Sequence, residues 1–205
     1  MRVYLETDRL VLRQFTMADV DNLYELNSDR DVMRFVNGGI PTPRAMIQDD
    51  ILPGYIEAYE PDQRFGHWAA IEKSSDEFVG WFGLMCREHA TSGDLDLGYR
   101  LRSSAWNRGY ATEGARALIR KCLTDLGARR VLANTYQDNH ASRRVMEKAG
   151  MRLIRTFRYT PEDILAGRTN HVTTGDLWDG DDVEYAILRT DWERLEAGAT
   201  SGTGT

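Results

Sequence analysis

The sequence predicts an α/β fold in which a mixed sheet of about seven strands carries helices on both faces. Alternating apolar and polar residues, which are typical of strands, recur up to residue 101. After residue 101, segments with helical spacing of apolar residues alternate with further strand-like segments. The 205 residues, 41% of them hydrophobic, suit one domain with a substantial core. We expect that domain over residues 1–196 and a disordered polar tail over 197–205.

Four elements are expected before residue 60. Residues 3–15 alternate as a single strand, after which Thr16 caps a helix. A short helical turn follows over 31–36. A second helix is expected over about 42–58, with a kink at Pro53 because proline removes a backbone donor from the helix.

Three strands are expected next along the chain. The segments 65–72 and 78–87 are joined by a polar turn, which is typical of a hairpin, and they lead into a strand over 94–101. A helix over 112–126 follows, and Gly127 provides its C-terminal stop signal.

The remaining elements again alternate. They are a strand over 129–136, a helix that begins at Asp138 or Asn139 and ends at Gly150, strands over 151–159 and 183–188, and a short helix around 191–195. The intervening residues 160–182 are polar and irregular.

The stretch 96–113 joins a strand to a helix through a polar loop that holds Arg108 and Gly109. Such a junction can bind phosphate, because free N–H groups of the first helical turn point at an anion and the helix dipole favours negative charge. Gly109 lets the backbone approach a ligand or adopt a positive φ. The loop is neither a P-loop nor a Gly-x-Gly-x-x-Gly motif, so an ordinary strand-to-helix connection is the alternative.

Charge is distributed unevenly along the chain. The net charge of −6 argues against general nucleic-acid binding. Residues 98–155 hold 13 Lys and Arg against four acids, a local charge of +9, so the remainder carries −15. A cationic segment centred on the loop favours a polyanionic small ligand, although solvated helix faces would produce the same pattern.

Composition also bears on location and on metals. We expect no membrane association and no export, because no apolar run approaches a membrane span and the first residues lack a signal-peptide core. Cys86 and Cys122 are expected as small buried residues in a reducing cytoplasm rather than as a disulfide. Cysteine and histidine show no metal-ligand spacing, so no metal is predicted.

Two stretches at this separation resemble the GNAT acetyltransferases. They are Trp-Asn-Arg-Gly-Tyr-Ala-Thr-Glu at 106–113 and Asn-His-Ala-Ser-Arg-Arg-Val-Met-Glu-Lys-Ala-Gly-Met at 139–151. More narrowly, together with the opening Glu-Thr-Asp-Arg-Leu-Val-Leu-Arg and the closing Val-Glu-Tyr-Ala-Ile, they resemble the branch that includes ribosomal-protein N-terminal alanine acetyltransferases. The resemblance covers about residues 5–195. It implies the GNAT fold, with a V-shaped splay of the sheet near 94–101, and an acyltransferase that uses acetyl-CoA as co-substrate.

The resemblance also assigns the coenzyme site. The loop 106–111 would hold the pyrophosphate through backbone N–H groups, and the strand 97–101 would pair with the pantetheine arm. Asn139 would hydrogen-bond the pantetheine, and Ser142 and Arg143 share its face of the helix. The implied coenzyme-binding residues are Leu97, Gly98, Tyr99, Leu101, Trp106, Asn107, Arg108, Gly109, Tyr110, Ala111, Thr112, Asn139, Ser142 and Arg143.

The catalytic residues follow the family pattern less closely. Many members carry a Tyr seven residues after the Asn, which protonates the departing thiolate, whereas this chain has Met146, which cannot donate a proton. Ser142 is the available substitute, unless it only touches the coenzyme. Asp96 stands where the family commonly has Glu and is the candidate base, unless it is an outward-facing strand carboxylate. A backbone N–H between Leu97 and Tyr99 would meet the oxyanion at the splay.

The acceptor implied by the branch is a primary amine, first a protein or peptide N-terminus and second a small amine such as a polyamine or aminoglycoside. At pH 7 an α-amine with a pKa of about 7.8 is deprotonated at a cost of roughly 1 kcal/mol, against roughly 4.6 kcal/mol for a lysine-like amine near 10.4. An N-terminal acceptor therefore needs only a weak base. The alternative outside the enzymes is a non-catalytic module that binds acyl-CoA. It stays open because Met146 stands where the family's proton-donating Tyr would be.

The segment 160–184 suggests a further property of the acceptor site. It holds seven acids against one base, and it either shapes a site for a cationic amine or is a solvated loop. The acids are Glu162, Asp163, Asp176, Asp179, Asp181, Asp182 and Glu184. The branch also implies a homodimer.

Overall fold

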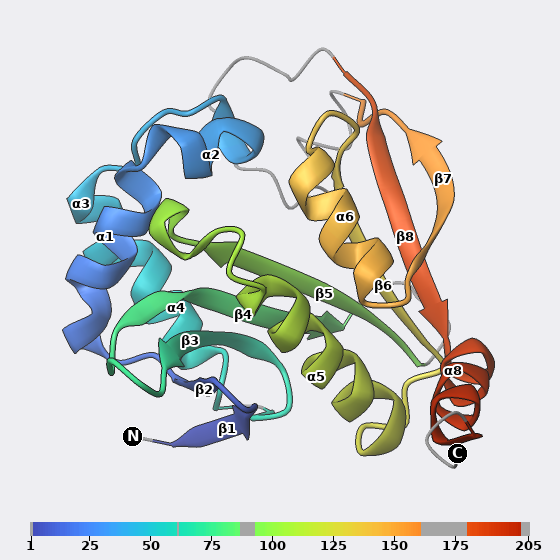
Figure 1. Ribbon diagram of the computed structural model, residues 1–205. Helices are drawn as coiled ribbons and strands as arrows, with labels where there is room; N and C mark the ends of the chain where they lie inside the picture. The colour runs from blue at the N-terminus through green and yellow to red at the C-terminus, as the bar shows by residue number, and fades with distance from the viewer. Residues whose placement is uncertain (1, 61, 87–92, 161–179, 202–205) are drawn as a thin grey trace.

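The computed structural model describes all residues except 1, 61, 87–92, 161–179 and 202–205. Within these residues an eight-stranded sheet forms the centre of the molecule, in the order β1-β2-β3-β4-β5-β6-β8-β7 (Figure 1). The strands are β1 (Val3–Glu6), β2 (Leu10–Gln14), β3 (Gly66–Glu72), β4 (Phe78–Cys86), β5 (Asp94–Leu101), β6 (Arg130–Tyr136), β7 (Arg152–Phe157) and β8 (Asp182–Leu188). The predicted α/β class with a mixed sheet is confirmed.

The sheet has eight strands rather than about seven because residues 3–15 form a hairpin instead of one strand. The chain turns back at residues 7–9, where the Thr7 N–H donates to the Leu10 carbonyl at 2.9 Å. The Thr7 hydroxyl also accepts the Leu10 N–H at 2.9 Å. These bonds close the turn, and β1 then pairs antiparallel with β2.

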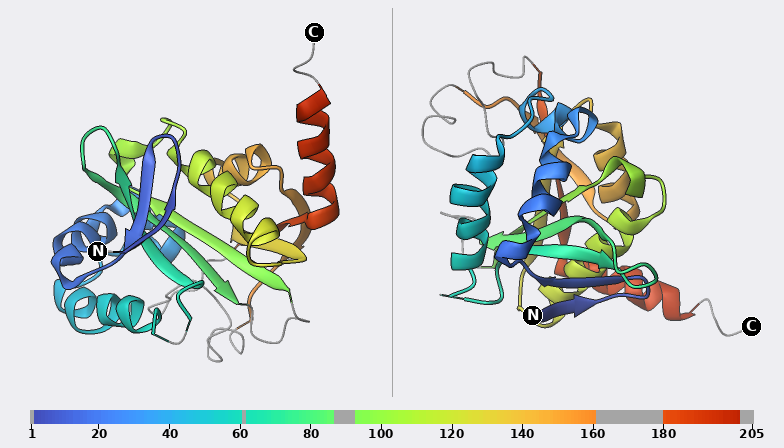
Figure 2. Two further views of the ribbon diagram at one scale, coloured as in Figure 1. Left: turned by 90° about the horizontal axis from the view of Figure 1, so that it is seen from below. Right: turned by 90° about the vertical axis from the view of Figure 1, so that its left-hand side faces the viewer.

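One face of the sheet is covered by α1 (Val20–Ser28), α2 (Arg30–Asn37) and α4 (Leu52–Glu57), as the left view of Figure 2 shows. Apolar side chains from these helices meet the strands in a core that includes Leu23 and Trp81. Before α1, Met17–Asp19 form a 3-10 turn, so the regular helix begins later than Thr16 predicts.

The predicted helix over 42–58 is present in three consecutive pieces. α3 (Arg44–Met46) continues into a π-helical turn (Ile47–Ile51) and then into α4. The wider turn lies directly before Pro53, which supplies no N–H to a helical hydrogen bond. The irregularity is therefore a π turn just before the proline rather than a kink at it.

The opposite face carries α5 (Tyr110–Thr124) and α6 (His140–Lys148) (Figure 1). A Cβ at Gly114 would overlap the Phe82 ring, so glycine is what allows α5 to lie close against β4. α5 begins at Tyr110, two residues earlier than predicted, because the Tyr110 ring is buried and anchors the first turn.

The C-terminal part is more helical than expected. α8 (Arg189–Ser201) is longer than the predicted short helix around 191–195 and includes the first residues of the predicted tail. Cys122 is buried as expected, but Cys86 is exposed at the end of β4. No helix in the part of the chain that the structure describes is long and apolar enough to cross a membrane.

The sheet opens between β5 and β6, as predicted. β5 and β6 are parallel neighbours in the sheet. They pair at only three positions, which are Asp94 with Arg130, Leu95 with Val131 and Asp96 with Leu132. Beyond these positions both strands continue without pairing to each other, whereas β6 remains paired with β8 along its whole length. This opening is the V-shaped splay.

Candidate functional site

The peptide groups of Leu97 and Tyr99 point into the splay. The Arg102 N–H donates to the Val79 carbonyl on the β4 side at 3.0 Å. Because peptide groups alternate in direction along a strand, those of Leu97 and Tyr99 point the other way, toward β6. The parallel pairing of Asp96 with Leu132 uses the Leu97 N–H, and beyond it no described β6 residue pairs with β5. The Leu97 carbonyl and the N–H and C=O groups of Tyr99 are therefore available to a ligand that lies in the splay.

The loop before α5 presents a second set of donors. The first hydrogen bond of the helix runs from the Glu113 N–H to the Gly109 carbonyl at 3.0 Å, so the N–H groups of Tyr110, Ala111 and Thr112 have no acceptor within the helix. Asn107 and Gly109 both adopt the left-handed conformation, with φ of 59° and 85°. This arrangement suits a phosphate group.

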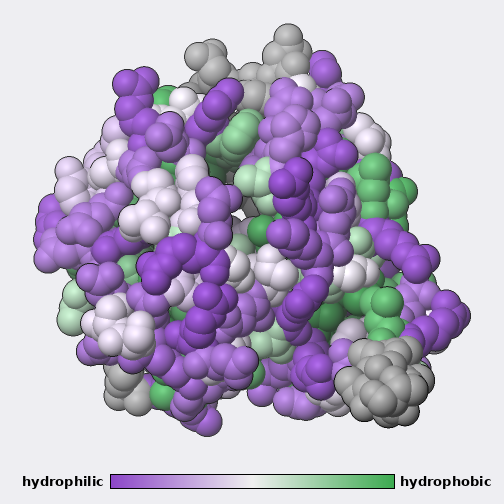
Figure 3. Space-filling model, viewed as in Figure 1, coloured by the Kyte–Doolittle hydropathy of each residue, from purple (hydrophilic) through white to green (hydrophobic). Residues whose placement is uncertain are grey.

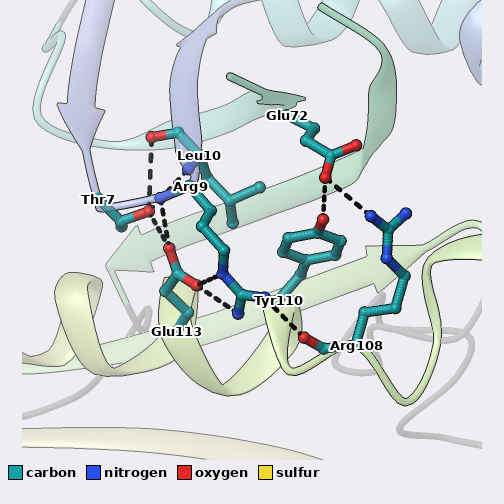
Figure 4. A network of polar contacts seen from close by, with 7 residues as sticks. All are labelled: Thr7, Arg9, Leu10, Glu72, Arg108, Tyr110 and Glu113. Atoms are coloured by element: carbon teal, nitrogen blue, oxygen red, sulfur yellow. Dashed lines mark hydrogen bonds and ion pairs between the residues drawn. The ribbon is translucent and has the colours of Figure 1, made fainter. Parts of the chain in front are cut away.

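Glu113 ties the loop to the N-terminal hairpin (Figure 4). Its carboxylate accepts hydrogen bonds from the Thr7 hydroxyl at 2.5 Å and from the Arg9 N–H at 2.9 Å, and it pairs with the Arg9 guanidinium at 2.6 Å. Burial opposes ionisation, but the hydrogen bonds from Thr7 and Arg9 outweigh it and lower the pKa of Glu113. The Arg9 guanidinium also donates to the Arg108 carbonyl at 2.9 Å. The turn of the first hairpin is thus clamped to the start of α5.

Tyr110 is the centre of the same network (Figure 4). Its hydroxyl donates to Glu72, whose carboxylate also pairs with Arg108 at 2.8 Å. The guanidinium carbons of Arg9 and Arg108 lie 4.6 and 4.8 Å from the centroid of the Tyr110 ring. The hydrogen bond from Tyr110 lowers the pKa of Glu72. The loop is therefore held in place by contacts with β3 and with the β1–β2 turn.

Asn139 and Arg143 are fixed by contacts around the start of α6. Asn139 is the N-cap, because its side-chain oxygen accepts the Ser142 N–H at 3.2 Å, and its amide group donates to the Thr135 hydroxyl at 3.0 Å. The Arg143 guanidinium donates to the Tyr185 hydroxyl at 3.2 Å and to the Gln137 carbonyl at 2.9 Å. Each side chain keeps further N–H donors that can face a ligand.

Ser142 contacts Tyr99 across the splay. The two hydroxyl oxygens lie 3.0 Å apart, and the Tyr99 hydroxyl also donates to the Ser142 carbonyl at 3.1 Å. Burial raises the pKa of Tyr99, so its phenol is protonated at neutral pH. Met146 is buried among the core side chains. The sequence predicted a role for the Tyr99 backbone, and the contact of its side chain with Ser142 was missed.

Asp96 lies on the other face of β5. It pairs in register with Met85, whereas Tyr99 pairs with Phe82, and side chains alternate between faces along a strand. Asp96 is half-buried at the last position where β5 pairs with β6. The two candidate catalytic side chains therefore flank the β5 backbone from opposite faces.

The acids at the end of the segment 160–184 are only partly described. Asp181 pairs with Arg158 at 3.1 Å and Glu184 with Arg155 at 2.9 Å, which neutralises both charges. Asp182 is buried. Glu162, Asp163, Asp176 and Asp179 lie outside the described residues.

Residues 9–152 match a family model described as an acetyltransferase (GNAT) domain. The chain belongs to the GNAT acetyltransferases. It is accordingly an acyltransferase that moves an acetyl group from acetyl-CoA to a nitrogen. The FsC-acetyl coenzyme A-N(2)-transacetylase of Aspergillus fumigatus is 31% identical to this GNAT chain over 195 residues, which cover 90% of it and 72% of the relative. The uncharacterized N-acetyltransferase YnaD of Bacillus subtilis is 25% identical over 190 residues, which cover 93% and 99%.

Solved structures share the fold. A GNAT-family acetyltransferase from Bacillus anthracis has a TM-score of 0.74 at 24% identity, covering 93% of this chain and 99% of that one. RimL, a ribosomal L7/L12 α-N-protein acetyltransferase in complex with coenzyme A, has a TM-score of 0.71 at 16% identity, covering 91% and 98%. Aminoglycoside acetyltransferase AAC(6')-Ib with coenzyme A has a TM-score of 0.68 at 21% identity, covering 91% and 99%.

The residues of this GNAT site fit the co-substrate that the family uses. A pantetheine arm needs backbone partners, which Leu97 and Tyr99 offer, and a pyrophosphate needs N–H donors, which the first turn of α5 offers. The surface is hollowed between the α2 and α6 sides, with hydrophobic residues at the bottom of the hollow (Figure 3). Among the described side chains, no group of three or more His, Cys, Asp or Glu could hold a metal ion.

Proposed function

We propose that the protein acetylates a primary amine by direct attack in a ternary complex, with a protein or peptide N-terminus as the preferred acceptor. The observation that carries the proposal is the unpaired edge of β5 at the Leu97 carbonyl and the Tyr99 peptide groups, placed between Asp96 on one face of β5 and Ser142 on the other. Bound acetyl-CoA supplies the activated acetyl group as a thioester.

Each part of the coenzyme site has a separate role in this proposal. The N–H groups of residues 110–112 bind the pyrophosphate, and the Asn139 amide, which retains a free N–H, donates to the pantetheine. The Leu97 and Tyr99 peptides orient the acetyl carbonyl, and an N–H group here stabilises the negative charge that develops on its oxygen. The remaining residues assigned to the coenzyme shape the strand, the loop and the first turns of the two helices.

Asp96 and Ser142 move the protons. The Asp96 carboxylate accepts the proton of the attacking amine, directly or through a water. A weak base is enough for an α-amine, because neutralising it at pH 7 costs only about 1 kcal/mol. The Ser142 hydroxyl gives a proton to the departing sulfur and regains one from solvent, and the Tyr99 phenol, within hydrogen-bond distance of it, orients that hydroxyl.

A small-molecule amine is the second candidate acceptor. The fold similarity to an aminoglycoside acetyltransferase, alongside that to RimL, is the observation that favours it. A non-catalytic coenzyme-binding module stays as the third, because Met146 lacks a proton to donate. We also propose a cytoplasmic location and a homodimer. Sizing of the purified protein by light scattering tests the dimer.

The test is to incubate the protein with acetyl-CoA and a pooled amine library and to follow free thiol. We expect release that depends on one class of amine and that falls in Asn139→Ala and Asp96→Ala. Tight binding of acetyl-CoA without thiol release on any peptide or small amine would instead favour the binding module.

A further inference from the structure

Among the residues that the structure describes, Arg100 has no acidic partner. Its side chain lies on the α1 and α4 side of β5, where it pairs in register with Trp81. One guanidinium nitrogen donates to the Asn27 side-chain oxygen at 2.7 Å, and the guanidinium carbon lies 5.3 Å from the centroid of the Trp81 ring. Among the described residues, Arg100 makes no ion pair and no second hydrogen bond. Most of its five N–H donors are therefore unused.

The neighbouring arginine behaves differently. Arg102, two residues further along the chain, pairs with Glu25 at 2.7 Å and also donates to Asn22. In the described part of the chain, a carboxylate partner is therefore available to Arg102 and not to Arg100.

The Trp81 ring beside Arg100 belongs to an aromatic cluster. Tyr55 stacks on His67 at 4.0 Å with an interplanar angle of 15°, and His67 meets the edge of Trp81 at 4.9 Å and 77°. Burial, and then the charge of Arg100, lower the pKa of His67 to about 4, so the imidazole is neutral at pH 7. Arg100 is thus the one positive charge in this cluster of four side chains.

The Arg100 guanidinium is half-buried, so it is partly withdrawn from water. Burial lowers the pKa of Arg100, which reports the loss of hydration around the guanidinium. A charge removed from water without a counter-ion destabilises the folded state, and an apolar replacement is often neutral or stabilising. The described part of the fold supplies no carboxylate to this cation, whereas an anionic ligand would supply the missing partner.

We propose that Arg100 is the anion-binding residue of the acceptor site, so that the acceptor is a primary amine that also carries a carboxylate. A guanidinium binds a carboxylate through two parallel hydrogen bonds. This inference rests on the proposed function, because it deepens the choice of acceptor for the same site. It also disfavours the cationic acceptors that the acidic segment suggested, since a polyamine would bring further positive charge to Arg100.

The spacing along β5 supports the assignment. Asp96, Gly98 and Arg100 follow one another on the same face, each about 7 Å from the next. An amine that reaches the splay near Leu97 and Tyr99 lies beside Asp96. Its carboxylate then lies about two residues away along the strand, within reach of the long Arg100 side chain.

Matched acceptors test the proposal. The panel pairs amino acids with their amides, and peptides that begin with Asp or Glu with peptides that begin with Asn or Gln. Two readouts are used: kcat/KM from thiol release, and calorimetric binding of each amine to protein loaded with CoA, which requires no turnover. We expect the wild type to prefer the carboxylate member of a pair by about 30-fold or more. A preference among the amino acids and their amides would assign the carboxylate to a small amino acid, and a preference among the peptides would assign it to a peptide side chain.

Variants at the two arginines connect the preference to Arg100. In Arg100→Gln the preference should fall to within about threefold, with acetyl-CoA affinity unchanged and with Tm unchanged or higher. Arg100→Lys should retain part of the preference, and the control Arg102→Gln should retain all of it.

The inference is overturned if the wild type treats both members of each pair alike, including the case in which neither binds, or if the preference survives in Arg100→Gln. Carboxylate-dependent binding without thiol release would support the anion site and refute the proposed transfer. Thiol release on amines without a carboxylate preference would support the proposed transfer and refute the anion site.

Discussion

Glu113→Gln should weaken both the fold and the coenzyme site. The substitution removes the charge that pairs with the Arg9 guanidinium at 2.6 Å and weakens the bonds from the Thr7 hydroxyl and the Arg9 N–H. A hydrogen bond to a charged group contributes about 1.5–3 kcal/mol, and Arg9 is partly exposed, so we expect a loss of about 2 kcal/mol in the free energy of unfolding. For a chain of this size that corresponds to a fall in Tm of about 4–8 °C.

The effect on the coenzyme follows from the same contacts. Arg9 also donates to the Arg108 carbonyl, so a displaced Arg9 frees the loop that precedes α5. We expect the KM for acetyl-CoA to rise about tenfold with kcat within about threefold, because the loop binds the coenzyme equally in the ground state and in the transition state. Steady-state kinetics with acetyl-CoA as the varied substrate measures this.

The pH dependence provides a third readout. The pKa of Glu113 is lower in the folded protein than in the unfolded chain. The folded state is therefore stabilised above the unfolded pKa of about 4.3, and this stabilisation is lost as the pH falls through the folded value. The stability difference between wild type and Glu113→Gln should be constant from pH 8 to about 6 and should shrink below about pH 4.

A surface ion pair serves as the control. Glu25→Gln removes the partner of Arg102, and the Glu25 side chain is 65% exposed, so we expect a change below about 1 kcal/mol and no effect on KM. Equal Tm and equal KM for wild type and Glu113→Gln would refute the reasoning, as would equal losses in the Glu113 and Glu25 variants.

Three further predictions follow from individual contacts. Gly114→Ala should destabilise the protein by about 1–3 kcal/mol, seen as a lower Tm, because the new methyl group overlaps the Phe82 ring. Tyr99→Phe should lower kcat about tenfold at an unchanged KM for acetyl-CoA, and Ser142→Ala should lose nothing more in the Tyr99→Phe background, because the two hydroxyls act as a unit. The wild type should lose stability as the pH falls from about 6.5 toward 4, where the unfolded chain takes up a proton that His67 resists, and His67→Phe should flatten this dependence in chemical denaturation.

Each of these has its own control or contrary result. Gly54→Ala is the matched control for Gly114→Ala, since a Cβ at Gly54 meets nothing within 4 Å, and it should leave stability unchanged or raise it slightly. Independent, multiplicative losses in the Tyr99 and Ser142 variants would show that the hydroxyls do not act together. A stability profile of His67→Phe that is parallel to that of the wild type would assign the acid sensitivity to other groups.

Local pattern was enough to predict most elements of this fold. Helical spacing identifies α5 through Ala115, Leu118 and Ile119, and alternation identifies β5 through Leu95, Leu97 and Tyr99. The position of the splay and the coenzyme loop came from the motifs at 106–113 and 139–151. Each of these signals lies in residues that are close together in the chain.

The features that local pattern missed depend on distant partners. α5 begins at Tyr110 because its hydroxyl bonds Glu72, 38 residues away. The break in the strand pattern at residues 7–9 is stabilised by Glu113, more than 100 residues away. Arg100 looks like any polar residue in an alternating strand, and only the packed structure reveals that no carboxylate of the described residues reaches it. Interactions of this range leave no periodic trace in a sequence.

Because β5 and β6 pair over a short distance, coenzyme binding would also affect how the two parts of the sheet are held together. Those three paired positions are the only strand-to-strand connection between the first five strands and the last three in the described sheet. The two halves of the sheet are therefore joined at one end of β5 and β6 and diverge toward the other end. If the pantetheine arm bonds the open edge of β5 as proposed, it would extend that half as an added strand, so the sheet would be completed on each uptake of the donor and left open on each release of the product.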